Sequence, residues 1–153
     1  MGIPDELKQR RQWLCWRYEH RGGHPTKLPV NSRTGSLAKT NDVSTWSSYD
    51  EALTAARDRG CDGVGFVFSR DDPYAGIDLD RCLDDHGALG SEAQDIVDAL
   101  ATYAEMSPSG HGLHCIVRGE VPAGARKQAV LAGQSVEVYS EGRFFCMTGE
   151  LRS

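Results

Sequence analysis

The sequence predicts an α+β fold in which strands outnumber helices. Seven short segments combine aromatic or β-branched residues with strand periodicity, while three segments have helix-start signals or helical periodicity. The strands occur in runs and do not alternate one by one with helices. This order is typical of an α+β sandwich and argues against a doubly wound parallel sheet.

The N-terminal part of the chain contains two of the predicted helices. Residues 4–11 predict a short helix, because an early proline is followed by two acids. Residues 12–19 have alternating side-chain character and are rich in aromatic side chains, as in a strand. Residues 20–44 are rich in Gly, Pro and Asn and predict a long loop. A capping box at residues 48–51 predicts a helix that ends at Gly60.

The rest of the chain predicts strands around one helix. Residues 63–69 and 75–80 predict two strands joined by a polar turn, and a helix begins at Ser91. Four further strands are predicted at residues 103–106, 113–118, 135–139 and 143–148. No repeat or linker interrupts this series, so we expect one domain over residues 1–153.

Composition bounds the class of protein. Hydrophobic residues make up 39% and charged residues 25%, which excludes a disordered chain. No apolar run approaches the ~20 residues of a membrane span, and the charged residues 1–11 have no signal-peptide core. We therefore expect a soluble cytoplasmic protein without a membrane partner. The five cysteines contain no Cys-x-x-Cys pair, so we expect buried thiols and no zinc site.

The distribution of charge is more informative than the net charge of −5. Residues 50–105 hold fourteen acids and four Lys or Arg, whereas residues 1–33 hold seven Lys or Arg and three acids. A protein that binds duplex DNA usually has a strong basic excess, which this chain lacks. An acidic central segment between basic ends suits a protein in which carboxylates bind metal ions and the cations bind a polyanion. Solvated acidic helices would also account for most of these acids.

The first candidate site is the predicted strand at residues 76–80. The two-residue period directs Asp78 and Asp80 to one face and the apolar residues beside them to the core. Two carboxylates roughly 7 Å apart repel one another unless a cation lies between them. Mg²⁺ or Mn²⁺ would supply that charge and leave positions for phosphate oxygens. The alternative is a polar strand end with Arg81 as its partner.

The second candidate site is the segment SPSGHGLH at residues 107–114. Glycines allow backbone N–H groups to approach an anion, and the serine and histidine side chains add donors. The candidate phosphate ligands are Ser107, Ser109, Gly110, Gly112 and His114. It is not a Walker loop, because no Lys follows the glycines and the next element is a strand. The alternative is a glycine hairpin whose histidine is hydrogen-bonded within the protein.

The third candidate site is Glu137, a single acid inside an apolar strand. If Val136 and Val138 face the core, Glu137 lies on the opposite face. A third carboxylate on a neighbouring strand would complete a ligand set with Asp78 and Asp80. Arg143 follows soon after and is a fixed cation for a triphosphate. The alternative is a glutamate that simply faces solvent.

Taken in order, these three segments resemble the archaeo-eukaryotic primase superfamily. More narrowly, they are similar to the N-terminal primase-polymerase domain of phage- and plasmid-type replication proteins. Asp78 and Asp80 match the first motif of that family, Ser109 and His114 lie in the second, and Glu137 matches the third. Upstream segments are also similar, so that the resemblance covers residues 13–149.

The resemblance implies an enzyme. The fold would be an RRM-like catalytic core, with an antiparallel or mixed sheet and flanking helices. The activity would be template-directed nucleotidyl transfer, making or extending primers from dNTPs or NTPs. Two Mg²⁺ or Mn²⁺ ions would be held by Asp78, Asp80 and Glu137. The triphosphate would be bound by Ser107, Ser109, Gly110, Gly112, His114, Arg143 and Lys27.

The resemblance also implies partners. The template and primer would be single-stranded DNA, contacted through phosphates by Arg10, Arg11, Arg17, Arg126 and Lys127. Many relatives continue into a helical domain and a helicase, so such a domain of the same replication protein is a further expected partner. The host would be a bacterial or archaeal cell, with a phage, plasmid or other mobile element as the source.

Two other functions stay open. One is a non-catalytic module that binds nucleotide or single-stranded DNA within a larger replication protein. The other is a metal-dependent nuclease, since nucleases also use clustered acids. Three clustered carboxylates argue against the first, and the Ser- and Gly-rich segment favours a triphosphate over the second. His111 lies between the two glycines, but we prefer His114 as the histidine of the second motif because it begins the strand.

Overall fold

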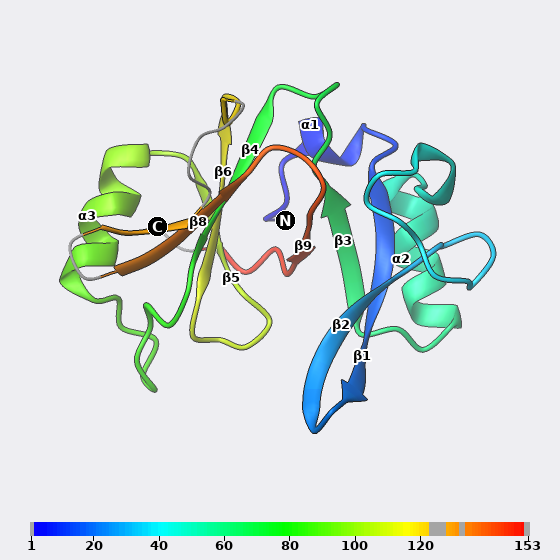
Figure 1. Ribbon diagram of the computed structural model, residues 1–153, viewed down its shortest axis with the longest axis horizontal. Coiled ribbons are helices and arrows are strands. Elements are labelled where there is room, and N and C mark those ends of the chain that lie inside the picture. The colour runs from blue at the N-terminus through cyan, green and yellow to red at the C-terminus, as the bar shows by residue number, and fades with distance from the viewer. Residues whose placement is uncertain (1, 123–127, 132–133, 152–153) are drawn as a thin grey trace. The chain divides into compact units, whose positions relative to one another are not determined.

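The computed structural model describes residues 2–122, 128–131 and 134–151. These residues form two units, each built on an antiparallel sheet (Figure 1). The four-stranded unit comprises Ile3–Val67 and Gly142–Met147, and the five-stranded unit comprises Met1–Gly2, Phe68–Glu141 and Thr148–Ser153. The predicted α+β class is confirmed. The expectation of a single domain over residues 1–153 stays a prediction.

The four-stranded unit has the sheet order β2-β1-β3-β9. Its elements are α1 (Asp5–Lys8), β1 (Trp13–Arg21), β2 (His24–Val30), the 3₁₀ helix η1 (Val43–Thr45), α2 (Tyr49–Asp58), β3 (Gly63–Val67) and β9 (Phe144–Met147). Helix α2 packs on β1 and β3, and Ala55 joins Cys15 and Val30 in a buried cluster (Figure 1). Trp13 is fully buried, and its ring meets that of Phe66 edge to face, with 5.3 Å between the ring centres.

The predicted capping box starts α2. The Ser48 hydroxyl accepts a hydrogen bond from the Glu51 backbone N–H at 3.1 Å, and the Glu51 carboxylate accepts one from the Ser48 N–H at 3.1 Å. The two bonds satisfy backbone donors that a helix start leaves without intrahelical partners. The helix is followed by Gly60, whose φ of +67° is the left-handed conformation expected after a helix end.

One loop prediction is wrong in part. Residues 24–30, expected within a long loop, form β2 and pair with β1 in seven antiparallel positions. The two prolines of this segment predicted a loop because proline cannot donate a backbone hydrogen bond. Strand β2 lies at the edge of its sheet, where no further strand of the described sheet pairs with Pro25 and proline is tolerated.

The five-stranded unit has the sheet order β5-β6-β4-β8-β7. Its elements are β4 (Tyr74–Leu79), α3 (Ser91–Leu100), β5 (Tyr103–Met106), β6 (Leu113–Arg118), β7 (Gln128–Leu131) and β8 (Gln134–Tyr139). Ile77 and Leu79 of β4 pack with Ala93 and Val97 of α3 in one buried cluster. One face of this sheet therefore meets the core and α3, as the two-residue period of β4 predicts.

Two features of this unit differ from the expectation. Strand β7 was not predicted, and it is a four-residue edge strand that pairs only with β8 among the described elements. The consecutive strands β3 and β4 belong to different sheets. The polar turn between them is present, since Asp72 accepts hydrogen bonds from the backbone N–H groups of Ser69 and Tyr74. No helix among the described residues combines the length and the apolar character that crossing a membrane requires.

Candidate active site on the five-stranded sheet

A single row of polar side chains crosses the five-stranded sheet. In the strand register, Glu105 of β5 is opposite His114 of β6, His114 is opposite Asp78 of β4, and Asp78 is opposite Glu137 of β8. Directly opposite residues in antiparallel strands carry their side chains on the same face. The row thus lies on the face opposite the buried cluster of Ile77 and Leu79.

His114 lies between two carboxylates of this row. Its Nε2 is 3.7 Å from Oδ1 of Asp78, and its Nδ1 is 3.9 Å from Oε2 of Glu105. The side chain is 8% exposed, compared with 23% for Asp78 and 0% for Glu105. These separations are longer than hydrogen bonds but within the range of ion pairs. The imidazole is therefore held close to the partly exposed Asp78.

Glu105 is a buried carboxylate with several donors. It accepts hydrogen bonds from the Tyr103 hydroxyl at 2.6 Å, the Thr148 backbone N–H at 2.7 Å and the Gly149 backbone N–H at 3.1 Å. Burial raises the pKa of Glu105, and these donors oppose that rise. The sequence analysis did not select Glu105, although it is a single acid in a short strand, as Glu137 is.

Glu137 is half-buried and is bonded along its own strand. The Tyr139 hydroxyl, two residues further on the same face of β8, donates to Oε2 of Glu137. Val136 is buried in the core cluster and Val138 packs against it, so Glu137 lies on the opposite face, as the strand period predicts. The structure therefore brings Glu137 next to Asp78, while Tyr139 fixes one carboxylate oxygen.

Asp80 lies one residue beyond the end of β4 and is exposed. Its backbone carbonyl accepts a hydrogen bond from the Gln134 side chain at 2.7 Å, and Arg81 follows with a left-handed φ of +51°. In the described part of the chain, no three His, Cys, Asp or Glu side chains are grouped closely enough to hold a metal ion. Of the three predicted metal ligands, Asp78 and Glu137 are directly opposite one another in the sheet, and Asp80 lies beyond the end of β4.

The predicted phosphate-binding segment is the loop between β5 and β6. The Gly112 N–H donates to the Ser107 hydroxyl and the His111 N–H to the Ser109 hydroxyl, both at 3.2 Å. The two hydroxyl oxygens are 3.0 Å apart and share a hydrogen bond. The Gly110 N–H bonds to the Ser107 carbonyl. The backbone N–H groups of Gly110, His111 and Gly112 thus form hydrogen bonds within the loop, and the role of this loop in binding phosphate stays a prediction.

This loop lies against the end of β4. A Cβ atom on Gly112 would be 3.0 Å from the Leu79 carbonyl oxygen, so any other residue here would displace the loop from the end of β4 by a few tenths of an ångström. The Leu83 N–H donates to the His111 carbonyl at 3.0 Å. An open pocket of about 550 Å³ results, lined by Asp80, Arg81, Leu83, Ser109, His111 and Gly112. The first and second candidate sites therefore meet here, and His111, not His114, lines the pocket.

The two predicted phosphate-binding cations belong to the four-stranded unit. Lys27 is exposed on β2, with its Nζ 5.9 Å from the centre of the Trp16 ring. Arg143 is exposed and directly precedes β9. Their roles as nucleotide ligands stay predictions. Of the predicted template contacts, Arg126 and Lys127 lie outside the described residues.

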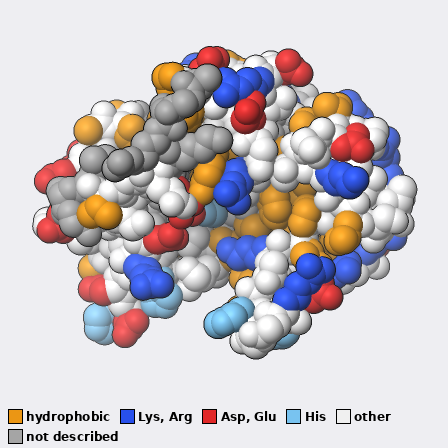
Figure 2. All heavy atoms as spheres, viewed as in Figure 1, with side chains coloured by type: hydrophobic (Ala, Val, Ile, Leu, Met, Phe, Trp, Pro, Cys, Tyr) orange, Lys and Arg blue, Asp and Glu red, His pale blue; other side chains and the backbone are white. Residues whose placement is uncertain are grey.

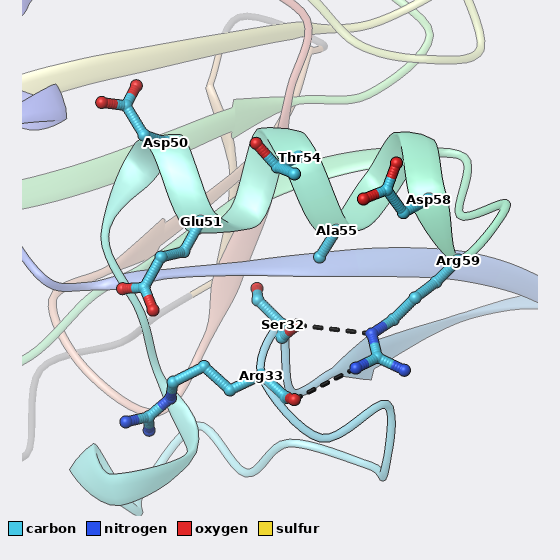
Figure 3. A pocket seen from close by; sticks show the side chains of 8 residues that line it. All are labelled: Ser32, Arg33, Asp50, Glu51, Thr54, Ala55, Asp58 and Arg59. Atoms are coloured by element: carbon cyan, nitrogen blue, oxygen red, sulfur yellow. Dashed lines mark hydrogen bonds between the residues drawn. The ribbon is translucent and has the colours of Figure 1, made fainter.

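A second open pocket, of about 670 Å³, lies beside α2 in the four-stranded unit (Figure 3). Arg59 crosses from the end of α2 and donates to the carbonyls of Ser32 at 3.3 Å and Arg33 at 3.0 Å. The Arg33 guanidinium donates in turn to the carbonyls of Ser44 and Trp46. Arg59 thus ties the end of α2 to one loop, and Arg33 ties that loop to the segment that precedes α2, so this pocket is part of the packing of the unit.

The five cysteines are free thiols. Burial raises the pKa of Cys82 to about 11 and that of Cys115 to about 12. Both thiols are therefore protonated at neutral pH, and both belong to the buried cluster under the sheet. They contribute to packing and not to nucleophilic chemistry.

Comparison with known proteins adds an independent observation. No family model matches the chain. The chain is 36% identical over 155 aligned residues to a protein named DNA primase-polymerase from Nitratiruptor phage NrS-1. The match includes 99% of this chain but 21% of the phage protein. The chain thus resembles one part of a phage DNA primase-polymerase, spanning about a fifth of its length.

Proposed function

We propose that this chain is the nucleotidyl-transfer region of a DNA primase-polymerase, which makes or extends primers on single-stranded DNA. The row of His114, Asp78 and Glu137 on one face of the five-stranded sheet carries the proposal. It combines two facing carboxylates with an imidazole, beside a Ser- and Gly-rich loop. The 36% identity to the phage protein supports the same function.

The fold is consistent with an RRM-like catalytic core. The five-stranded sheet is antiparallel, α3 packs on one face, and the polar row occupies the other. This arrangement separates the residues that stabilise the sheet from those available for chemistry, because neighbouring positions of each strand face opposite sides. The expected helical domain and helicase would belong to the remainder of a longer replication protein.

The donors of this face suit a hard divalent cation. Asp78 and Glu137 present carboxylate oxygens on adjacent strands, and Asp80 follows at the end of β4. Carboxylate oxygens are the ligands that Mg²⁺ and Mn²⁺ prefer. Two such ions, held by Asp78, Asp80 and Glu137, would activate the primer 3′-hydroxyl and neutralise charge on the departing pyrophosphate.

The remaining residues bind and orient the triphosphate. His114, held beside Asp78, donates an N–H to a phosphate oxygen. Ser107 and Ser109 share a hydroxyl hydrogen that can turn toward a phosphate, and Gly112 keeps their loop against the end of β4. Lys27 and Arg143, which belong to the four-stranded unit, stay predicted as further cations for the triphosphate. The rate enhancement then comes from positioning and electrostatic stabilisation.

The test is incorporation of labelled dNTPs on a primed single-stranded template with Mg²⁺ or Mn²⁺. We expect extension by the wild-type chain, and loss of at least about a hundredfold for Asp78→Asn and Glu137→Gln with the fold retained. A matched control is Asp58→Asn, which removes an exposed carboxylate from α2. Equal extension by wild type, Asp78→Asn and Glu137→Gln would contradict the proposal.

Two parallel measurements address the alternatives. Cleavage of a labelled single strand with metal and no nucleotide, lost in Asp78→Asn, would identify a nuclease. Binding of dNTP without any extension, on the primed template and with both metals, would identify a non-catalytic binding module. Because the chain spans about a fifth of the related protein, the same assay is repeated on a longer natural chain.

A further inference from the structure

The hairpin of β1 and β2 extends beyond the sheet to which it belongs. The two strands pair from Cys15–Val30 to Arg21–His24, whereas β1 pairs with β3 only from Trp13 to Trp16. The outer part, residues 17–28, is a two-stranded ribbon with no third strand among the described elements (Figure 1). A two-stranded ribbon gains little stability by itself. The length of this hairpin is thus not explained by the core of the unit.

The base of the hairpin is anchored by Trp16. Its side chain is 4% exposed, and its Nε1 donates to the Val64 carbonyl at 3.1 Å. The indole lies over Gly63, where an added Cβ would be 3.0 Å from Nε1. The Tyr18 ring meets the Trp16 ring edge-on, with 5.0 Å between centres and an angle of 90°. Tyr18 is held in place in this way while 42% of it stays exposed.

Cationic side chains outnumber acidic ones in the outer ribbon, and one aromatic side chain, Tyr18, lies beside them. Tyr18 and His20 share one face with Lys27, which is opposite Tyr18. Between residues 17 and 27 there are three Lys or Arg, two His and one acid, in a chain of net charge −5. That acid, Glu19, is paired with Arg21 at 3.3 Å. Residues 20–27 are all exposed, and Figure 2 shows histidine and Lys or Arg side chains around the lower end of the hairpin.

We propose that the outer ribbon, residues 17–27, is a binding surface for single-stranded DNA. Arg17 and Arg21, on one face of the ribbon, would contact phosphates, and the Tyr18 ring, on the other face, would stack on a base. Stacking requires a base that is not already paired and stacked in a duplex, so the single strand is the expected ligand. This inference rests on the proposed function, since it assigns the template or primer strand to a surface of this chain.

The test is equilibrium binding of a fluorescein-labelled oligo(dT) to the full chain, by anisotropy and without metal or nucleotide. We expect Tyr18→Ala to weaken binding about fivefold or more, through loss of stacking. Arg21→Ala should weaken binding. It should also reduce the magnitude of the negative slope of log affinity against log salt by about 0.7, as expected for one lost phosphate contact on a single strand. Arg57→Ala removes an exposed cation from α2 and should leave the affinity unchanged.

The outcomes separate this inference from the proposed function. If both hairpin variants bind oligo(dT) with the affinity and the salt slope of the wild type, the inference is overturned, even if dNTP incorporation is intact. No binding of oligo(dT) by the folded wild type, or equal binding of a duplex, would also overturn it. Weaker binding by Tyr18→Ala and Arg21→Ala, but not Arg57→Ala, supports the inference even if no dNTP is incorporated. Arg21 lies beside the Gly22-Gly23 turn, so its replacement tests the charge without disturbing the core.

Discussion

His114 is placed between Asp78 and Glu105, with its Nε2 3.7 Å from the first carboxylate and its Nδ1 3.9 Å from the second. The two carboxylates have different surroundings. Asp78 is partly exposed and faces Glu137, whereas Glu105 is fully buried and bonded to Tyr103, Thr148 and Gly149. Glu105 is too deeply buried to meet a nucleotide, so we expect it to act on nucleotide binding only through His114.

Replacement of Glu105 should affect nucleotide binding through His114. Glu105→Gln keeps the side-chain shape and removes the charge beside Nδ1, so we expect the affinity for a dNTP analogue to fall about threefold to tenfold. His114→Asn should lower the affinity at least as much. The double variant should bind no more weakly than His114→Asn alone, because the two residues act as one unit. Calorimetric titration measures the four affinities.

The affinities of the two single variants and the double variant distinguish the possible roles of Glu105 and His114. Losses that add in the double variant would mean that Glu105 acts independently of His114. Unchanged binding by His114→Asn would instead remove His114 from the proposed nucleotide ligands. Tyr103→Phe is the control, because it removes one donor to Glu105 but keeps the carboxylate.

The stability difference between Glu105→Gln and wild type should depend on pH. Burial raises the pKa of Glu105 above its ordinary 4.5, so the folded protein holds this proton more tightly than the unfolded chain does. Wild-type stability therefore falls relative to the variant as the pH rises through the interval above 4.5. Urea unfolding of both proteins at pH 5 and pH 8 gives the two free-energy differences. A difference that is the same at both pH values would contradict the expectation.

Removal of the Tyr139 hydroxyl should weaken the binding of the metal ion on which the proposed reaction depends. The hydroxyl donates to Oε2 of Glu137 and fixes the orientation of a proposed metal ligand. Loss of such an orienting bond typically lowers metal affinity or activity by about tenfold. We expect Tyr139→Phe to require a correspondingly higher Mn²⁺ concentration for half-maximal dNTP incorporation. Tyr49→Phe, in the four-stranded unit, is the matched control, and identical Mn²⁺ curves for both variants would refute the role of Tyr139.

Loss of the α2 cap should destabilise the protein without altering chemistry. Ser48→Ala removes the acceptor for the Glu51 N–H and leaves that donor without its cap. The expected cost is about 1 kcal/mol of unfolding free energy. Urea titration should show a lower midpoint with an unchanged slope. Ser36→Ala, at an exposed position, serves as control, and equal midpoints for both variants would show that the capping box adds nothing.

Local sequence signals predicted those elements whose structure depends on nearby residues. The capping box located α2, and the strands at Tyr103–Met106 and Leu113–Arg118 have the expected bounds. Local signals missed β2 and β7, both edge strands, because such strands are stabilised by pairing with a neighbour more than by their own residues. The division of the strands between two sheets was likewise not predictable, since it depends on contacts between distant segments.

The candidate site was likewise predictable from the sequence only in part. The period of β4 and β8 predicted the faces of Asp78 and Glu137, and the register shows that they are opposite one another. Their pairing could not be predicted from spacing along the chain. Glu105 had a visible signal, a single acid in a short strand, but its importance depends on residues that only the fold brings near it.

The route of the chain determines when the polar row can be completed. After β8 the chain enters the four-stranded unit to form β9, and then returns to the five-stranded unit at Thr148. The backbone donors to Glu105 come from this return segment, at Thr148 and Gly149. During synthesis on the ribosome, Glu105 and His114 are therefore made long before the groups that fix Glu105. The polar row reaches its final arrangement only when both sheets have been translated.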